Sequence, residues 1–303
     1  MKVAVTGFSG FVGRQVLREL VGSGHEVVCV GRLSARERVD DIPGREQFEF
    51  REFDVLGGHS SAGVFDGVDA VIHLVGIISE CGSSRFEAIH AKGTEKVVVA
   101  AKQGGVPRFL QMSALGVREG ARSRYHQTKW TGECFVRDSG LLWTIFRPSM
   151  IFGPEDQAIR FFAAMSKWSP MIPAFGGGTN LIQPIAVEDV AKCFVAALDS
   201  EASIERTYDL CGDARMSFRS MIEEILHACR RRRLIVSLPF SLAQVQAVFL
   251  EWLFDRCLGM RPPLNQDQLL MLQEDNVGDN QLAKGHLGLR PLEFKSGLQR
   301  YLP

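Results

Sequence analysis

The fold of this chain is decided by residues 1–13, MKVAVTGFSGFVG. An apolar run at residues 3–5 leads into three glycines at a G-x-x-G-x-x-G spacing, and a helix-like segment at 11–21 follows at once. This order predicts a strand, a tight turn and a helix N-terminus, where free backbone N–H groups and the helix dipole attract a phosphate. A plain strand-to-helix turn is the alternative. We expect a dinucleotide to be bound by Gly7, Ser9, Gly10, Phe11, Val12 and Gly13.

The three glycines have separate expected roles. Gly7 permits the tight turn, Gly10 lets a pyrophosphate approach the backbone, and Gly13 lets the helix pack closely on the sheet. Their spacing is not the G-x-G-x-x-G of ordinary dehydrogenases.

Composition places the chain among soluble globular proteins. Its 303 residues, 46% apolar and 23% charged, suffice for one large domain or a large and a small one. The formal net charge is zero, so there is no general case for nucleic-acid binding. Seven cysteines without a C-x-x-C pair fit buried thiols in a reducing compartment. Neither a signal peptide nor a long apolar run is visible, so we expect a cytoplasmic address.

The first half alternates short apolar strands with helical segments, which predicts a parallel sheet covered on both faces. The expected fold class is α/β, a doubly wound parallel sheet of the Rossmann type that binds its ligand at the carboxyl ends of the strands. The expected strands span 2–6, 26–31, 48–53, 70–74, 108–112 and 144–147. The expected helices of this half span 11–21, 86–103 and 125–138.

After Pro148 the pattern loosens into a smaller mixed lobe. We expect a short strand at 181–184, a helix that begins near Val187, and further helices at 217–230, 241–258 and 266–273. The expected division is a NAD(P)-binding Rossmann domain at 1–150 and a substrate or partner lobe at 151–303. Parts of 181–200 should pack back on the Rossmann sheet.

Tyr125 and Lys129 form a Y-x-x-x-K pair on a predicted helix. Residues four apart share a helical face, so both side chains can project to one place. A phenol has a reference pKa of about 10 and is a poor acid or base at neutral pH, but a nearby ammonium lowers that pKa. The lysine can also hold the ribose of a nicotinamide cofactor. An exposed helix with an accidental spacing is the alternative.

Several motifs in this order resemble the extended and atypical short-chain dehydrogenase/reductase superfamily. They are TGFSGFVG, Asp54-Val55 after the third strand, VIHLVG, YHQTK and RPSMIFGP. More narrowly, SRYHQTKWTGE, FRPSMIFGPED, QPIAVEDVA and LLMLQEDNV are similar to one atypical branch. That branch holds the Rossmann-type accessory subunit of mitochondrial respiratory complex I and its bacterial relatives.

The resemblance implies further roles at the cofactor site. Asp54 and Val55 would hold the adenine, Leu74, Val75 and Gly76 would line the cofactor with backbone, and residues from Pro148 to Ile151 would pass near the nicotinamide. Tyr125, Lys129 and Ser113 would form the catalytic set.

Arg32 is the residue that we expect to choose between cofactors. An acidic residue at the end of the second strand would accept the ribose hydroxyls of NAD(H), whereas an arginine can pair with a 2′-phosphate. Here the strand ends Val30-Gly31-Arg32, and no carboxylate follows before Glu37. NADP(H) is therefore favoured over NAD(H), with an ordinary solvated arginine as the alternative.

Two departures from the superfamily pattern bear on catalysis. Its catalytic serine stands in a Ser-Ser run, but this chain has Met112-Ser113-Ala114, so the serine position falls on either Ser113 or Ala114. The asparagine of the N-x-x-G-T motif is replaced by His90. Cofactor binding is compatible with both changes, whereas turnover depends on them.

Residues 230–258 are the segment in which the sequence suggests a binding surface for a membrane or a protein partner. Four arginines, Arg230 to Arg233, precede a segment rich in apolar side chains. A basic run beside an aromatic-rich helix can lie on an anionic membrane, so we expect a peripheral contact with the inner face of a membrane or with a respiratory complex. The alternatives are a helix buried against the sheet domain with arginines capping the preceding helix, or arginines that attract an anionic substrate.

Three functions remain open from sequence. The first is an NADP(H)-binding protein of the short-chain dehydrogenase/reductase type, either a reductase of a lipophilic or quinone-related small molecule or a subunit associated with a respiratory complex. The second is an NAD-dependent nucleotide-sugar epimerase or dehydratase. The third is a non-catalytic partner that NADPH stabilises. The histidines lack metal-ligand spacing, so we expect no metal; the substrate and the oligomeric state stay undetermined.

Overall fold

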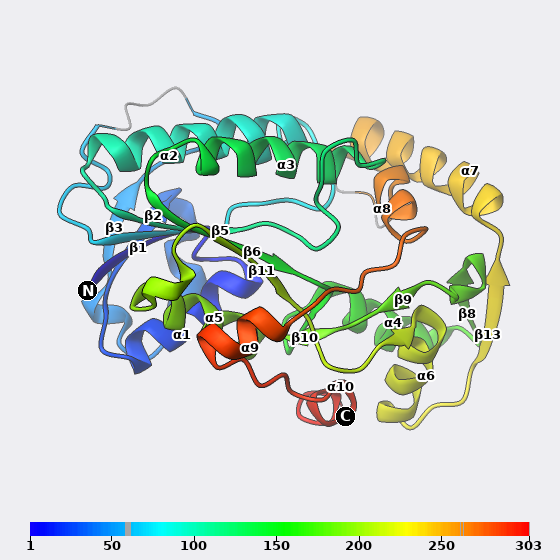
Figure 1. Cartoon of the computed structure of the whole chain (residues 1–303). Helices are drawn as coiled ribbons and strands as arrows, with labels where there is room; N and C mark the ends of the chain where they lie inside the picture. The colour runs from blue at the N-terminus through cyan, green and yellow to red at the C-terminus, as the bar shows by residue number, and fades with distance from the viewer. Residues whose placement is uncertain (58–61, 261, 263, 303) are drawn as a thin grey trace.

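The computed structural model describes residues 1–57, 62–260, 262 and 264–302. Its centre is a seven-stranded sheet of order β11-β6-β5-β4-β1-β2-β3, with every neighbouring pair parallel (Figure 1). The strands are β1 Lys2–Thr6, β2 Glu26–Gly31, β3 Glu49–Glu52, β4 Ala70–His73, β5 Arg108–Met112, β6 Leu142–Pro148 and β11 Arg206–Leu210. The predicted doubly wound parallel sheet is confirmed, and its order reverses between β1 and β4, where such sheets bind ligands.

Helices cover both faces of the sheet (Figure 1). On one face lie α2 Gly93–Gln103, preceded by the π-helical turn η3 Glu87–Lys92, and α3 Arg124–Arg137. On the other lie α1 Phe11–Gly22, α5 Val187–Leu198 and α9 Gln281–Leu287. Alternate residues of β1 enter different cores: Val3 and Val5 pack with Val190 of α5, while Ala4 packs with Val97 of α2. Burial on both faces explains why these strands are continuously apolar.

Two segments from the second half of the chain join the Rossmann layer. Helix α5 shares a core with α1 and β1, and β11 pairs with β6 from Arg206↔Thr144 to Leu210↔Pro148. Strand β11 was not predicted, because its sequence, RTYDL, alternates polar and apolar side chains as an edge strand does.

The remaining elements form the predicted smaller, mixed lobe. Its own core gathers Phe152, Ile159, Met221, Ile222 and Phe294. The lobe holds α4 Gln157–Trp168, α6 Phe218–Ala228 and α10 Phe294–Leu298, and three strand pairs: β7 Ile151–Phe152 with β10 Ile185–Ala186, β9 Leu181–Ile182 with β12 Met216–Ser217, and β8 Met171–Phe175 with β13 Leu234–Leu238. Short 3-10 turns occur at η1 Leu33–Val39, η2 Arg45–Gln47, η4 Gly176–Gly178 and η5 Glu201–Ser203.

Helix α7 Phe240–Glu251 continues as the π-helical η6 Trp252–Leu258, and α8 Gln266–Met271 follows. Only small side chains of α7 are buried, Ala243 and Ala247, whereas Val245 is 71% and Phe249 57% exposed. The alternative of a helix that buries its large apolar side chains against the sheet domain is therefore wrong. Within the described chain, no helix combines the length and the apolar character needed to cross a bilayer.

Candidate cofactor and active site

The glycine turn has the geometry of an anion site. Gly7 has a φ of +75°, and a Cβ there would lie 2.9 Å from the carbonyl carbon of Leu74; a Cβ on Gly13 would lie 2.3 Å from the Gly7 oxygen. These two positions therefore require glycine. Gly10 is exposed, and α1 begins after it with no side-chain cap and no acidic residue in its first turn. The first N–H groups of α1 are thus available to a phosphate.

The other residues expected at the cofactor surround this turn or end neighbouring strands. Leu74 donates its N–H to the Thr6 oxygen at 3.0 Å, which brings the loop after β4 against Gly7. Asp54 accepts the Leu56 N–H at 3.0 Å, and Val55 packs against Gly93 at the start of α2. Four further residues expected at the cofactor are half-buried: Ser9, Phe11, Val75 and Ile151. Gly76 is exposed, and Val12 and Pro148 are buried.

Arg32 directly follows β2 and is exposed. Its guanidinium has no hydrogen-bond or ion-pair partner among the residues that the structure describes. Nearby, the Arg36 guanidinium carbon lies 4.7 Å from the centre of the Phe50 ring, as in a cation–π contact. An unpaired guanidinium at this strand end fits the phosphate-binding role expected of Arg32.

Tyr125 and Lys129 lie on α3 beneath the loop that follows β4. Tyr125 is 8% exposed, and its ring makes edge contacts with the rings of Phe86 and His90 at 5.8 and 5.2 Å between centroids. The Lys129 ammonium donates to the Met112 oxygen at 3.0 Å and lies 3.1 Å from the place where a Gly76 Cβ would be. The structure thus brings Lys129 to the ends of β4 and β5, and Tyr125 lies one turn earlier on α3, against the side chains of η3 and the segment before it.

The electrostatics of this pair differ from the expectation. Burial raises the pKa of Tyr125 to about 12, and burial lowers the pKa of Lys129 to about 8, partly opposed by the Glu133 carboxylate. The expectation that Lys129 lowers the pKa of Tyr125 is wrong in this structure. The physical reason is that aromatic side chains surround the phenol, while the ammonium is directed at the Met112 oxygen.

His90, which stands at the position of the superfamily's asparagine, makes two side-chain hydrogen bonds. Its Nε2 accepts the Ile77 N–H at 3.1 Å, and its Nδ1 lies 3.1 Å from the Thr128 hydroxyl. Burial, helped by the nearby Lys129 charge, lowers the pKa of His90 to about 2, so the ring is neutral. His90 therefore ties the loop after β4 to α3.

Ser113 is committed to a buried ion cluster. Its hydroxyl donates to Glu133 Oε1 at 2.6 Å, and the same carboxylate binds Arg147 at 2.8 and 2.7 Å and Arg137 at 3.0 Å. Glu133 is fully buried and Ser113 is 2% exposed. Ala114, the alternative serine position, is half-buried and has no hydroxyl.

Sequence reasoning missed Asp267, which caps the helix that carries Tyr125. Its two carboxylate oxygens accept the N–H groups of Arg124 at 3.0 Å and of Tyr125 at 2.6 Å. The Asn265-to-Gln268 capping box signals the start of α8, but no local signal points to a contact with α3. In the part of the chain that is described, no group of three His, Cys, Asp or Glu side chains could hold a metal.

A parallel Rossmann sheet with a glycine turn, an uncapped helix N-terminus and a Tyr-x-x-x-Lys pair defines a dinucleotide-binding protein of the short-chain dehydrogenase type. The model of the NAD dependent epimerase/dehydratase family matches residues 3–211, and this chain belongs to that family. The predicted resemblance to the extended superfamily and its complex I branch is confirmed.

The similar proteins include subunits of respiratory complex I and a reductase. The chain is 30% identical over 299 residues to "NADH dehydrogenase [ubiquinone] 1 alpha subcomplex subunit 9, mitochondrial" of Arabidopsis thaliana, an alignment that covers 96% of this chain and 74% of that protein. The Mus musculus protein of the same name is 28% identical, over 78% of this chain and 63% of its own length. "Ceramide reductase" of Caulobacter vibrioides is 29% identical, over 64% and 60%.

Solved structures share the fold. A UDP-glucuronic acid 4-epimerase from Bacillus cereus, in complex with UDP-glucuronic acid and NAD, matches with a TM-score of 0.74 at 20% identity, over 99% of this chain and 98% of that chain. This likeness shows that the two proteins share one fold, the Rossmann sheet and the smaller lobe together, over nearly their whole lengths.

Proposed function

We propose that this protein binds NADP(H) and reduces a carbonyl group of a lipophilic, quinone-related substrate while it is associated with a membrane or a respiratory complex. The observation that carries the proposal is that the Lys129 ammonium lies against Gly76 and the Met112 oxygen, after β4 and at the end of β5, with Tyr125 one turn earlier on the same helix. The name of the ceramide reductase supports the reduction of a lipophilic substrate, and the names of the complex I subunits support the association with a respiratory complex.

Arg32 is the basis for choosing NADP(H). It is exposed, follows β2 directly and is free to pair with a 2′-phosphate. Native mass spectrometry of the purified protein should therefore find NADPH or NADP⁺. Arg32→Ala should weaken NADPH binding about tenfold or more and NADH binding little. Arg206→Ala, which removes an exposed arginine from β11, is the matched control; tightly held NAD alone would contradict this choice.

A bound nicotinamide cofactor supplies the hydride in such a reduction. Tyr125 would give its proton to the carbonyl oxygen, and Lys129 would orient the nicotinamide ribose. Burial raises the pKa of Tyr125 to about 12, so the phenol carries its proton at neutral pH but is a weak donor until the bound substrate and cofactor change its surroundings. Ser113 could bond the same oxygen only if its hydroxyl left Glu133.

The reduction can be tested with NADPH and two lipophilic probes, a short-chain ubiquinone and a long-chain aliphatic ketone. Tyr125→Phe should abolish turnover and leave NADPH affinity unchanged, because the ring is kept and only the proton donor is lost. Equal turnover of the wild type and the variant would eliminate the acid role.

We propose that the membrane contact lies on the outer face of α7 and the first residue of η6. Leu242, Val245, Phe249 and Trp252 are 60%, 71%, 57% and 52% exposed and recur at three- and four-residue steps, which puts them on one helical face. The arginine run lies at the other end of β13, so cationic and apolar surfaces share one edge of the lobe. This combination favours an anionic bilayer surface.

Flotation with vesicles tests this contact. Phosphatidylglycerol-containing vesicles should carry the wild-type protein at low salt, and Phe249→Ser with Trp252→Ser should abolish flotation. Leu142→Ser, at an exposed leucine of β6, should have no effect. A wild-type protein that does not float would leave the respiratory complex as the partner of this face.

A second candidate function is that of a structural partner which NADPH stabilises without turnover. The bond between Ser113 and Glu133 favours it, because it withdraws the expected catalytic hydroxyl from the substrate. NADPH would then raise the Tm by mass action, and Tyr125→Phe would change neither that shift nor any rate. A nucleotide-sugar epimerase would instead copurify with NAD.

A further inference from the structure

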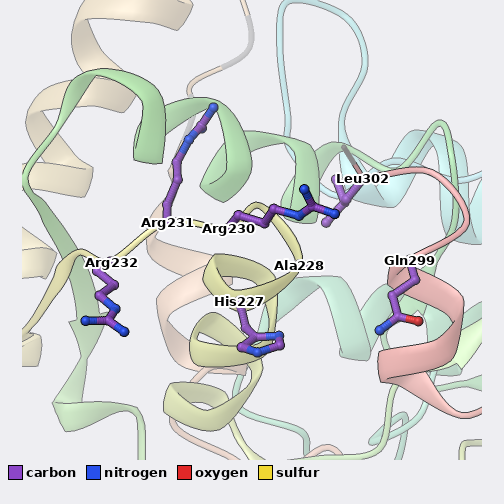
Figure 2. Close-up of a pocket in the computed structure, with 7 residues that line it drawn as sticks. All are labelled: His227, Ala228, Arg230, Arg231, Arg232, Gln299 and Leu302. Atoms are coloured by element: carbon purple, nitrogen blue, oxygen red, sulfur yellow. The ribbon is translucent and has the colours of Figure 1, made fainter.

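An open cavity of about 620 Å³ lies between the end of α6 and the C-terminal residues. It is lined by His227, Ala228, Arg230, Arg231, Arg232, Gln299 and Leu302 (Figure 2). Three of these described residues are arginines, and none of the seven has a carboxylate side chain. In a chain with no net charge, this is a strong local excess of positive charge.

The backbone of Arg230 adopts a conformation that usually belongs to glycine. Its φ is +51°, and it stands directly after the end of α6, where its N–H bonds the His227 oxygen at 2.9 Å and the Arg231 N–H bonds the Leu226 oxygen at 2.9 Å. Glycine is preferred at this left-handed position because a Cβ is strained there. An arginine here has a conformational cost, and residues held in such conformations cluster at functional sites.

The arginines of the cavity are not equivalent. The Arg231 guanidinium donates to the Ala163 oxygen at 3.1 Å and to the Ser166 hydroxyl at 2.9 Å, so it is held by α4. Of the alternatives from sequence, capping of α6 holds for the backbone, since the Arg230 and Arg231 N–H groups bond its last carbonyls, whereas the Arg231 side chain contacts α4. The Arg230 guanidinium has no partner among the described residues, and Figure 2 shows it extended toward Leu302, above the space between His227 and Gln299.

We propose that this cavity binds a phosphate-bearing anion, with the Arg230 guanidinium as its main ligand. The planar guanidinium offers two parallel N–H donors to phosphate oxygens, and the Gln299 amide and the His227 ring can donate from the two sides. Arg231, fixed by α4, adds charge without moving. A free phosphate monoester and the headgroup of a phospholipid present the same chemistry to these groups.

Titration calorimetry of the full chain with inorganic phosphate and with glycerol 3-phosphate tests the site. The wild type should bind a probe saturably, and Arg230→Gly should weaken binding about tenfold or more, as expected for a lost charge-assisted pair. The same variant should keep or raise the Tm, by up to about 2 °C, because glycine relieves the left-handed strain. Loss of binding without loss of stability separates a ligand role from a structural one.

Glu205 supplies the matched control. Among the described residues it is the second non-glycine residue with a positive φ, +56°, and it is not one of those that line the cavity. Glu205→Gly should affect the Tm in the same way and leave phosphate binding unchanged. Arg230→Gln, which keeps a non-glycine residue at the strained position, should lose binding as Arg230→Gly does.

Vesicles separate the two sources of phosphate. Binding to phosphatidic acid vesicles that requires Arg230, combined with weak binding of the soluble monoester, would identify a lipid headgroup; strong binding of the monoester would identify a free metabolite. The soluble probes do not involve the α7 face, so failure of the membrane contact would not affect them. The proposal is overturned if neither the probes nor the vesicles bind, or if Arg230→Gly binds them as the wild type does.

Discussion

The Asp267 carboxylate accepts the backbone N–H of Tyr125 at 2.6 Å, although the two residues are 142 positions apart in the chain. Its other oxygen accepts the Arg124 N–H at 3.0 Å, and Ser123 accepts the His126 N–H at 3.2 Å. The first three N–H groups of α3 are thus satisfied by side chains, two of them by one residue of the smaller lobe. The position of the proposed proton donor therefore depends on how α8 packs.

Asp267→Ala should destabilise the protein by about 1–2 kcal/mol, because it removes a cap and a carboxylate from the positive end of a helix dipole. Asp267→Asn keeps one acceptor and should lose about half of that. Urea unfolding measures both changes. If Asp267 also positions Tyr125, kcat should fall in the folded alanine variant while NADPH affinity stays the same; unchanged kcat would limit Asp267 to stability.

Two glycines of α1 should respond oppositely to alanine. A Cβ at Gly13 would lie 2.3 Å from the Gly7 oxygen and 2.7 Å from the Phe8 oxygen, both backbone atoms that cannot move aside cheaply. Gly13→Ala should therefore cost about 3 kcal/mol and abolish cofactor binding. At Gly22 no atom lies within 4 Å of a Cβ, so Gly22→Ala should stabilise α1 by about 0.5–1 kcal/mol. Thermal unfolding with and without NADPH distinguishes the two.

The sequence predicts the Rossmann half well because local patterns determine it. Six of the seven strands of the main sheet were expected, and the expected strands at 2–6, 26–31 and 108–112 coincide with the observed ones. Buried parallel strands are apolar throughout and are easily recognised. Strand β11 is an edge strand with a polar alternation, and only its pairing with β6 places it in the sheet.

The site was harder to predict because its details are tertiary. The spacing of Tyr125 and Lys129 places them on one helical face, but the direction of each pKa shift depends on what buries them. Whether the Ser113 hydroxyl bonds a substrate or Glu133 depends on its side-chain rotamer and on the residues packed around it, which the local sequence does not specify. The contact of Asp267 with α3 could not be predicted for the same reason, since its hydrogen-bond partners lie in a distant segment of the chain.

The buried Lys129 should give stability a measurable pH dependence. Its pKa is about 8 in the folded state and near the ordinary lysine value of 10.5 in the unfolded chain, so the unfolded chain binds more protons between these values. The cost of burying the ammonium is present in full below pH 8 and disappears as pH rises toward 10.5. Between pH 7.5 and 9 the stability of the wild type should rise by about 1 kcal/mol relative to Lys129→Met.

Urea unfolding at the two pH values measures that difference, and Lys129→Met cancels the contributions of the cysteines and of Tyr125. The variant should also be the more stable protein at pH 7.5, because methionine fills the same space without a buried charge. An equal pH dependence in both proteins would show that the ammonium is solvated in the folded state.

Substitutions at Ser113 and Ala114 should show which of the two stands at the superfamily's catalytic serine position, and we expect it to be Ala114. Ser113→Ala removes a hydrogen bond to the buried Glu133 carboxylate and should cost about 1–2 kcal/mol of stability, while turnover per folded molecule stays unchanged. Ala114→Ser adds a hydroxyl at the half-buried neighbouring position and should raise turnover about tenfold, as a donor to the carbonyl oxygen does. Rates with NADPH and the short-chain ubiquinone, normalised to the folded fraction, measure both effects. If Ser113→Ala is as inactive as Tyr125→Phe, the hydroxyl leaves Glu133 during the reaction and belongs to the catalytic set.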